Sequence, residues 1–445
     1  MERAILKNLI SWKLKTDRQP LIVRGVRQCG KTYILRHFGK TCYEDTAYFN
    51  FEENRALCDV FEKNYDTSRI LFELSLKHGK TINPGKTLVI FDEIQICDRA
   101  LTSLKYFSEN APEYHIVCAG SLLGIALNQN SSFPVGKVEF LDMYPMSFIE
   151  FATAKGETAL AEFISGVGMD DSIPSVAADA AETLMQEYNL VGGMPAAVKK
   201  WCETGNIEET ETVQRNIIDS FERDFAKHAP IELFPKLTAI WRSVPVQLAR
   251  ENKKFIFSQV KKSWRAKDLE DALEWLISAG LLYKVSKIEK PAFPLSSYAD
   301  DTAFKLYMCD IGLLRCLSGL PYEAISQNIE IYSEFKGAMA ENFVLSELLK
   351  AGLTKAFFWT SGNSAEVDFI IQEKLLIIPI EVKAAKNVKA RSLAEYRKKY
   401  APPLSVKFSM VEKINGDEVL NLPLYTAASY GNIIKSAVNR PHSIT

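Results

Sequence analysis

The sequence predicts an α/β protein in which a parallel-sheet domain is followed by a helical region and a second α/β region. An apolar run at 21–23 enters a glycine-rich turn and then a stretch compatible with a helix. A continuous apolar run at 88–91 ends in two carboxylates, which is typical of a strand buried on both faces of a parallel sheet. Near the end of the chain, 366–371 and 375–382 form the pattern of a β-hairpin.

The bulk properties describe an ordinary globular chain. Its 445 residues predict two or three domains, and 47% hydrophobic with 24% charged residues allow a large core. The formal net charge of -1 excludes a global field that recruits nucleic acid or an anionic membrane. The 8 cysteines are scattered, as expected for reduced thiols in a cytoplasmic protein. Apolar runs stay shorter than the roughly 18 residues of a membrane span, so we expect no membrane partner.

The turn after the first strand has the pattern G-x-x-x-x-G-K-T. Its eight positions are Gly25, Val26, Arg27, Gln28, Cys29, Gly30, Lys31 and Thr32. Glycines let the backbone turn tightly, so that N–H groups and the start of a helix cradle phosphate oxygens. Lys31 is then expected to reach the β- and γ-phosphates of ATP, and Thr32 to hold Mg²⁺. The alternative is a glycine-rich turn with a solvated lysine. The strand before the turn and the helix after it make this alternative less favoured.

Two carboxylates follow the apolar strand at 88–91. Asp92 is expected to coordinate Mg²⁺, and Glu93 to orient or activate the water that attacks the γ-phosphate. Ser121 follows a further strand at 115–119. It either contacts the γ-phosphate or caps the helix beginning at Leu122, and the sequence leaves both roles open.

The remaining elements follow from periodicity. We expect a first helix over 3–15, strands at 47–51 and 138–141, and a long helical region over 54–78. A helix is predicted from Phe148, and residues 155–230 are largely helical, with a break at Gly192-Gly193-Met194-Pro195.

Helices at 233–250, 258–262 and 267–279, followed by a strand at 281–285, predict a winged-helix module. The third helix presents mostly carboxylates, which repel phosphates and argue against reading of the major groove by this helix. The preceding segment is basic and offers either contacts to a nucleic-acid backbone or a solvated face. Its basic residues are Arg250, Lys253, Lys254, Lys261, Lys262 and Arg265.

The last region predicts a helix at 334–351, a strand at 356–359, the hairpin, a helix at 391–400 and a strand at 405–409. Within it, Glu341, Asp368 and Glu381 are candidate Mg²⁺ ligands for phosphodiester hydrolysis, and Lys383 is a candidate for charge stabilisation or activation of water. The alternative is a surface strand with a salt bridge.

Along nearly its whole length the chain resembles the prokaryotic AAA-type ATPases with a C-terminal domain of uncharacterised function. The resemblance implies an AAA+ fold at the N-terminus, ATP binding, and a PD-(D/E)xK nuclease-like fold at the C-terminus. The family pattern usually has Arg after Gly136, where this chain has Lys137. If that position is an arginine finger, hydrolysis is slow. Other finger candidates, by location only, are Arg99, Arg215 and Arg223. The matching stretches are 25–32, 88–95, 119–121, 136–137, 144–148, 192–195, Glu341, 366–368 and 381–383.

The predicted segments are an ATPase core (1–155), a helical lid (156–230), a winged-helix connector (231–321) and a nuclease-like domain (322–445). Together they predict an ATP-dependent switch coupled to a C-terminal effector. The alternatives are an ATP-regulated, metal-dependent DNA endonuclease and a non-catalytic regulator that binds a protein or nucleic acid. Self-association is left open by the sequence.

Overall fold

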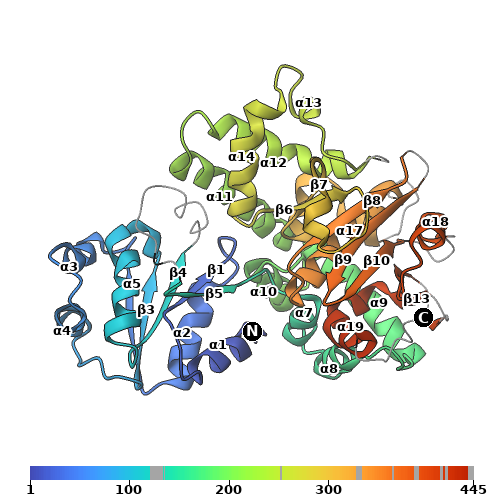
Figure 1. Cartoon of the computed structure of the whole chain (residues 1–445). Coiled ribbons are helices and arrows are strands. Elements are labelled where there is room, and N and C mark those ends of the chain that lie inside the picture. Colours follow the sequence, from blue (N-terminus) through green and yellow to red (C-terminus); the bar gives the residue numbers. More distant parts are fainter. Residues whose placement is uncertain are drawn as a thin grey trace. The chain divides into compact units, whose positions relative to one another are not determined.

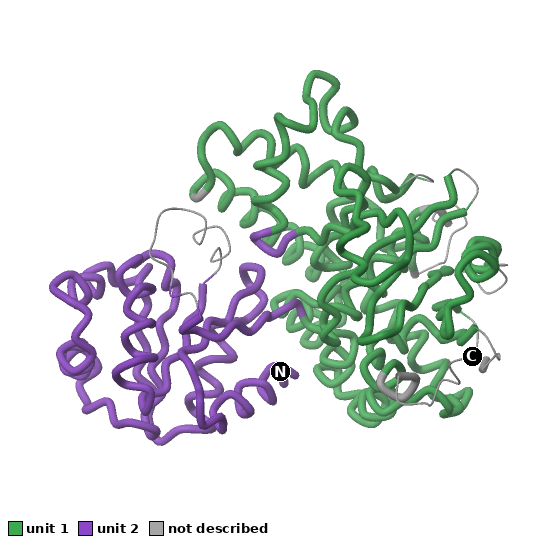
Figure 2. The backbone as a smooth tube through the Cα atoms, in the orientation of Figure 1, with its two compact units in different colours: residues 1, 146–277, 282–445 green, residues 2–145, 278–281 purple. Residues whose placement is uncertain are grey.

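The computed structural model describes residues 1–120, 134, 136–250, 253–326, 333–362, 365–384, 390–410, 414–415 and 419–438 (Figure 1). Two compact units divide the chain (Figure 2). We call residues 2–145 with 278–281 the N-terminal unit, and residues 1, 146–277 and 282–445 the C-terminal unit. Apart from 278–281, the segments predicted as lid, connector and nuclease-like domain all fall in the C-terminal unit.

A five-stranded parallel sheet forms the centre of the N-terminal unit, with the strand order β2-β3-β4-β1-β5. All five strands predicted for this region are present. Their bounds are β1 (Leu21–Arg24), β2 (Asp45–Asn50), β3 (Thr87–Asp92), β4 (His115–Gly120) and β5 (Glu139–Asp142). Every residue of β3 and β4 is buried, as continuous apolar runs predict for central strands. Because the strands are parallel, the ends of β1 and β3 lie at the same edge of the sheet.

The helices of the N-terminal unit are α1 (Ile5–Lys13), α2 (Lys31–Cys42), α3 (Asp59–Glu62), α4 (Thr67–His78) and α5 (Asp98–Asn110), with short 3₁₀ turns at η1 (Arg55–Cys58) and η2 (Ile94–Ile96). The region expected to be helical over 54–78 is helical in three separate segments, η1, α3 and α4. Asp66 starts α4 as its N-cap, with its carboxylate accepting from the N–H groups of Ser68 and Arg69. This cap favours a new helix over continuation of α3.

An eight-stranded mixed sheet, β12-β13-β11-β10-β9-β8-β6-β7, organises the C-terminal unit. Its strands are β6 (Leu282–Ile288), β7 (Ala299–Met308), β8 (Ala356–Thr360), β9 (Glu366–Glu373), β10 (Leu376–Val382), β11 (Val406–Ser409), β12 (Ile414–Asn415) and β13 (Leu420–Pro423). β9 and β10 form the predicted hairpin. The strand expected at 281–285 is part of β6, which pairs antiparallel with β7 and in parallel with β8. Strands β6 and β7 therefore belong to the same sheet as the C-terminal hairpin.

The helices of this unit precede, interrupt and follow its sheet. They are α7 (Phe148–Ala154), α8 (Thr158–Gly166), α9 (Ser175–Val191), α10 (Pro195–Thr204), α11 (Ile207–His228), α12 (Phe234–Leu248), α13 (Phe257–Val260), α14 (Ala266–Ser278), α15 (Ile311–Ser318), α16 (Tyr322–Ser326), α17 (Ser333–Lys350), α18 (Arg391–Tyr400) and α19 (Tyr430–Val438), with η3 (Leu295–Tyr298) and η5 (Leu424–Ser429). Helix α14 buries Leu269, Ala272, Leu273 and Leu276, as its periodicity predicts.

A close backbone junction in the C-terminal unit explains the glycine pair at 192–193. A Cβ atom on Gly193 would lie 2.1 Å from the carbonyl oxygen of Met146, and one on Gly192 would lie 2.3 Å from Asp310 Oδ1. The Met146 N–H donates to Gly193 O (2.7 Å), and the Gly193 N–H donates to Asp310 Oδ2 (2.6 Å). The start of α7, the end of α9 and the start of α15 thus meet through backbone atoms and the Asp310 carboxylate, with no room for a side chain at 192 or 193.

We predict that Gly193→Ala lowers the free energy of unfolding by about 1–3 kcal/mol or more. The added methyl group would overlap the Met146 backbone, which cannot move without shifting the start of α7. The matched control is Gly166→Ala at the end of α8, where a Cβ meets nothing within 4 Å. That control should be neutral or slightly stabilising. Thermal unfolding of both variants measures the difference, and equal melting temperatures would show that the junction tolerates a side chain.

Candidate functional site

The phosphate-loop pattern forms the turn between β1 and α2. Gly30 caps α2 with a left-handed backbone (φ 99°), and the non-glycine Gln28 also has positive φ (65°). Such a conformation is uncommon for a residue with a side chain and is concentrated at functional loops. Helix α2 begins at Lys31, so its first N–H groups adjoin the loop. The geometry is that of an anion-binding turn at a helix N-terminus.

Lys31 lies within the loop rather than in solvent. Its Nζ donates to Gly25 O (2.8 Å) and to Val26 O (3.0 Å), and the residue is 7% exposed. An ammonium group held by two loop carbonyls is positioned beside the anion-binding turn. A solvated lysine, the alternative considered from the sequence, does not describe it.

The phosphate loop and the acidic strand end meet directly. The Thr32 hydroxyl donates to Asp92 Oδ2 (2.8 Å), which joins the first turn of α2 to the end of β3. The Tyr48 hydroxyl donates to the same oxygen (2.7 Å), and Asp92 is 2% exposed. Burial, followed by the hydrogen bond to Asp92, raises the pKa of the Tyr48 phenol. The two residues predicted to hold Mg²⁺ are therefore neighbours.

Sequence reasoning missed Tyr48. It lies on β2 with its ring under the guanidinium of Arg36 (4.1 Å to the ring centroid). A signal was present, because Phe49 and Phe51 alternate with Tyr48 and Asn50 and so separate an apolar face from a polar one. Parallel pairing then places Asn50 opposite Asp92.

Glu93 follows Asp92 in a left-handed backbone conformation (φ 53°). Its Oε2 accepts from the side-chain amide of Gln95 (2.6 Å), and its own N–H donates to Asp92 Oδ1 (3.1 Å). In this left-handed turn the two adjacent carboxylates have different partners: Asp92 accepts from Thr32 and Tyr48, and Glu93 accepts from Gln95. Ser121, the third predicted catalytic residue, lies outside the described residues.

The loop is also held from β5 and from the N-terminal segment. A Cβ atom on Gly25 would lie 2.0 Å from Met143 O, so glycine is required for this approach. The Met143 N–H donates to Arg24 O (2.8 Å). The Arg3 guanidinium donates to Cys29 O (2.8 Å) and to Tyr144 O (2.7 Å). The segment after β5 is thus packed on the phosphate loop.

Three of the four candidate arginine-finger positions have partners within their own units. The Lys137 ammonium pairs with Glu109 (3.1 Å), and Arg99 donates to Phe61 O (2.8 Å). Arg215 pairs with Glu211 along α11, and Arg223 is exposed.

The C-terminal carboxylates form one cluster. Glu341 on α17, Asp368 on β9 and Glu381 on β10 are 2%, 7% and 1% exposed. Asp368 Oδ2 accepts from the Val382 N–H (2.8 Å), and Lys383 Nζ lies 2.5 Å from Glu381 Oε1. The structure therefore brings together all four residues predicted from the sequence.

Two lysines that sequence reasoning did not assign also enter this cluster. Lys253 pairs with Glu341 Oε1. Lys305 on β7, with no exposed surface, lies 2.5 Å from Glu366 Oε1, 3.7 Å from Glu341 Oε2 and 4.0 Å from Asp368 Oδ1. Lys253, one of the basic residues considered for nucleic-acid contact, therefore points into the protein.

The pKa shifts follow from these neighbours. Burial raises the pKa of Glu341, but Lys253 and Lys305 more than offset it and hold that pKa at about 2. Burial, Glu341 and Glu381 raise the pKa of Asp368. Burial lowers the pKa of Lys305, and the surrounding carboxylates reverse this effect. Across the described residues, no three His, Cys, Asp or Glu side chains are arranged to hold a metal ion.

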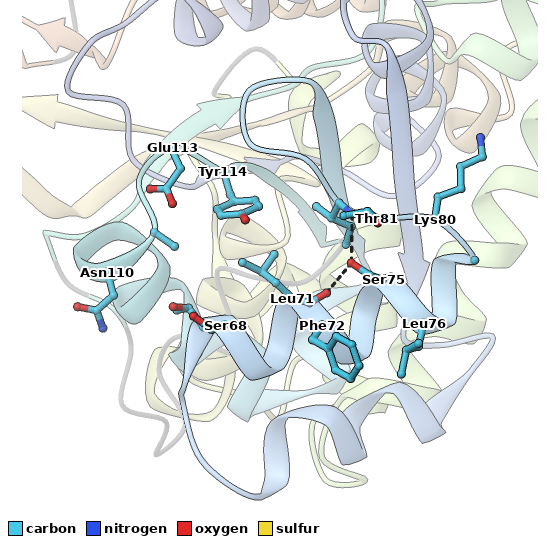
Figure 3. A pocket seen from close by; sticks show the side chains of 14 residues that line it. Ser68, Leu71, Phe72, Ser75, Leu76, Lys80, Thr81, Asn110, Glu113 and Tyr114 are labelled. Carbon is cyan, nitrogen blue, oxygen red and sulfur yellow. Dashed lines mark hydrogen bonds between the residues drawn. The ribbon is translucent and has the colours of Figure 1, made fainter.

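A separate open pocket of about 580 Å³ lies beside α4 in the N-terminal unit (Figure 3). Phe72 and Leu76 line it and are exposed, and the Ser75 hydroxyl bridges Leu71 O and the Ile82 N–H. None of the predicted site residues lines this pocket. Within the described chain, no helix combines the length and apolar character needed to cross a membrane.

Three family models match successive parts of the chain. Residues 17–152 match an AAA domain, residues 182–324 a domain of unknown function (DUF8612), and residues 336–425 another domain of unknown function (DUF4143). No curated protein matches the chain significantly.

Solved structures with similarity include the Walker-type ATPase PABY2304 of Pyrococcus abyssi, with 14% identity, a TM-score of 0.45, and coverage of 71% of this chain and 95% of that one. The ORC1 protein of Aeropyrum pernix in complex with DNA has 12% identity and a TM-score of 0.28, with coverage of 73% and 94%. C. elegans PCH-2 has 12% identity and a TM-score of 0.22, with coverage of 39% and 49%.

The AAA-domain match includes β1, the phosphate loop, β3 and its terminal carboxylates. Sequence pattern, loop geometry and family match therefore agree on the same residues. They support an ATP-binding domain of the AAA type at residues 17–152.

Proposed function

We propose that the N-terminal unit binds Mg²⁺-ATP and hydrolyses it, and that its nucleotide state controls the C-terminal unit. The observation that carries the proposal is the hydrogen bond between Thr32 and Asp92, which places the two expected Mg²⁺ ligands 2.8 Å apart. Hydroxyl and carboxylate oxygens suit Mg²⁺, which commonly takes only one or two protein ligands beside nucleotide phosphates. Bound there, the ion would neutralise charge that develops on the phosphates.

Each residue then has a defined task. Lys31 binds the β- and γ-phosphates, and the loop N–H groups from Gly25 to Thr32 bind phosphate oxygens. Glu93 orients or deprotonates the attacking water. Ser121 keeps its two roles of γ-phosphate contact or helix cap. Lys137 stands where the family pattern has arginine. It lacks the planar guanidinium group that can donate two parallel hydrogen bonds, which favours slow ATP turnover.

The switch is proposed to act through the segment 143–146, which continues from one unit into the other along the chain. In the N-terminal unit, Met143 packs on Gly25 of the phosphate loop. In the C-terminal unit, Met146 O accepts from the Tyr188 hydroxyl (2.7 Å) and from Lys350 Nζ (3.2 Å). Each end of the segment is anchored in its own unit. A shift of the phosphate loop would therefore reach Met146 through the few rotatable bonds of residues 143–146.

For the C-terminal unit, a non-catalytic effector that binds a protein partner is favoured over an endonuclease. The exposed face of α14 carries Glu270, Asp271 and Glu274, which repel a nucleic-acid backbone. The PD-(D/E)xK-like fold and the winged-helix character of 231–321 remain part of the proposal, as does a cytoplasmic location, which suits eight free cysteines. DNA binding is the second candidate, supported by the exposed basic residues Arg250, Lys261, Lys262 and Arg265.

Lys31→Ala is expected to lower ATP affinity by about 10²-fold or more, because it removes a charge that faces two phosphates. Lys40→Ala, an exposed lysine at the other end of α2, is the matched control and should retain affinity. Calorimetric titration with Mg²⁺-ATP measures both variants. Equal affinity in the two would remove Lys31 from the nucleotide site.

Glu93→Gln is nearly isosteric and keeps a group that can face Gln95. We expect ATP to remain bound while turnover falls by about 10²–10⁴-fold, the usual effect of losing a positioned general base. Steady-state phosphate release measures turnover, with exposed Glu53→Gln as the control. Turnover at the wild-type rate would assign the attacking water to another residue.

Coupling between the units is testable at the anchored segment. We expect Mg²⁺-ATP to change hydrogen exchange at the amides of Met146, Phe148 and Gly193, which donate to Gly193 O, Glu347 Oε2 and Asp310 Oδ2. In Lys31→Ala the same addition should have no effect. Unchanged exchange in a wild-type protein shown to be saturated with ATP would leave ATP binding intact and reject the switch.

A further inference from the structure

The carboxylate cluster of the C-terminal unit contains its own cations. We propose that the Lys305 ammonium group occupies the position that a divalent cation would take between Glu341, Glu366 and Asp368, so that the cluster is held by its own lysines and binds neither Mg²⁺ nor Mn²⁺. This inference is independent of the nucleotide site. It concerns contacts within the C-terminal unit alone.

The position of Lys305 is the first argument. It has no exposed surface, and its Nζ lies within 4.0 Å of oxygens from α17 and from two positions of β9. The ring of Phe358 lies beside it, 5.2 Å from Nζ to the centroid. A buried ammonium group is retained only when it is paired. Lys305 therefore depends on these carboxylates as much as they depend on it.

Most oxygens of the predicted metal ligands already have partners. Glu341 Oε1 pairs with Lys253, and Glu341 Oε2 accepts from the Tyr307 hydroxyl (2.7 Å). Asp368 Oδ2 accepts from a backbone N–H, and Glu381 Oε1 pairs with Lys383. Among the described residues, Glu381 Oε2 is a buried oxygen without a hydrogen-bond partner. Asp368 Oδ1 has the Lys305 ammonium group as its neighbour, at 4.0 Å. These two oxygens do not supply the near-octahedral set of ligands that Mg²⁺ needs.

Charge is the third argument. Four carboxylates (Glu341, Glu366, Asp368 and Glu381) face three ammonium groups (Lys253, Lys305 and Lys383), which leaves a net formal charge of 3 − 4 = −1. A divalent ion would make this buried cluster positive and would lie within a few ångströms of Lys305. Like charges at that separation repel strongly in a poorly hydrated interior.

The test uses the full-length chain without nucleotide, in an Asp92→Asn background that removes the carboxylate of the candidate metal site in the N-terminal unit. Mn²⁺ is the probe, and binding is followed by electron paramagnetic resonance and by the melting temperature. We expect no saturable Mn²⁺ binding while Lys305 is present. We also expect no metal-dependent cleavage of supercoiled or linear DNA. Saturable binding that Asp368→Asn abolishes would overturn the proposal, and so would cleavage that Asp368→Asn abolishes.

Removing the lysine should create the missing site. Lys305→Ala is expected to lower the melting temperature, because it leaves buried carboxylates without their cation, and Mn²⁺ should then raise it again by a few degrees. The matched control is Lys284→Ala on neighbouring β6, whose ion pairs with Glu274 and Asp301 are long (4.0 and 3.9 Å). That variant should show no response to Mn²⁺. A folded Lys305→Ala protein without any Mn²⁺ response would count against the proposal, and the wild-type measurement stands even if this variant does not fold.

Discussion

The backbone at each end of residues 143–146 approaches a glycine too closely for any other residue. At one end the Met143 carbonyl occupies the space that a side chain on Gly25 would need, and at the other the Met146 carbonyl does the same at Gly193. A side chain added at either glycine would be costly, because the backbone in its way cannot move aside as the end of a long side chain can. The phosphate loop, the start of α7 and the end of α9 all depend on it. The glycine motifs at 25–30 and 192–193 therefore have related structural tasks, and only the first is proposed to have a chemical one as well.

Much of the N-terminal unit was predictable because local pattern and tertiary environment agree there. Its strands are continuous apolar runs that have only one compatible environment, the centre of a parallel sheet. The same geometry explains why Thr32 and Asp92, sixty positions apart, could be expected to meet. Tyr48 was missed because its contact with Asp92 depends on the register between β2 and β3, which no local pattern specifies. The division of 54–78 was missed because the cap at Asp66 outweighs helical periodicity on both sides of it.

In the C-terminal unit the acidic residues were predictable and their partners were not. The hairpin pattern placed Asp368 and Glu381 on neighbouring strands, but Lys253 and Lys305 come from segments far away in the sequence. A weak signal existed in β7, where Phe304, Leu306 and Met308 alternate with Lys305 and Tyr307. All five residues are buried, so Lys305 and Tyr307 need hydrogen-bond or ion-pair partners in the interior. A lysine within such a strand predicts a buried acid, but not which one.

A buried ion network contributes little net stability compared with a well-packed apolar core, because desolvation offsets most of the attraction between its charges. It is nevertheless costly to leave incomplete, since each unpaired member becomes a buried charge. The contacts of Lys253, Lys305 and Tyr307 with Glu341 therefore make the positions of three segments interdependent: the residues before α13, strand β7 and helix α17. An interdependent network of this kind holds one arrangement of the sheet and of helix α17. If the carboxylate cluster binds no metal, as proposed above, its role is structural. A regulated change in the C-terminal unit would then have to move the cluster as a whole or leave it intact.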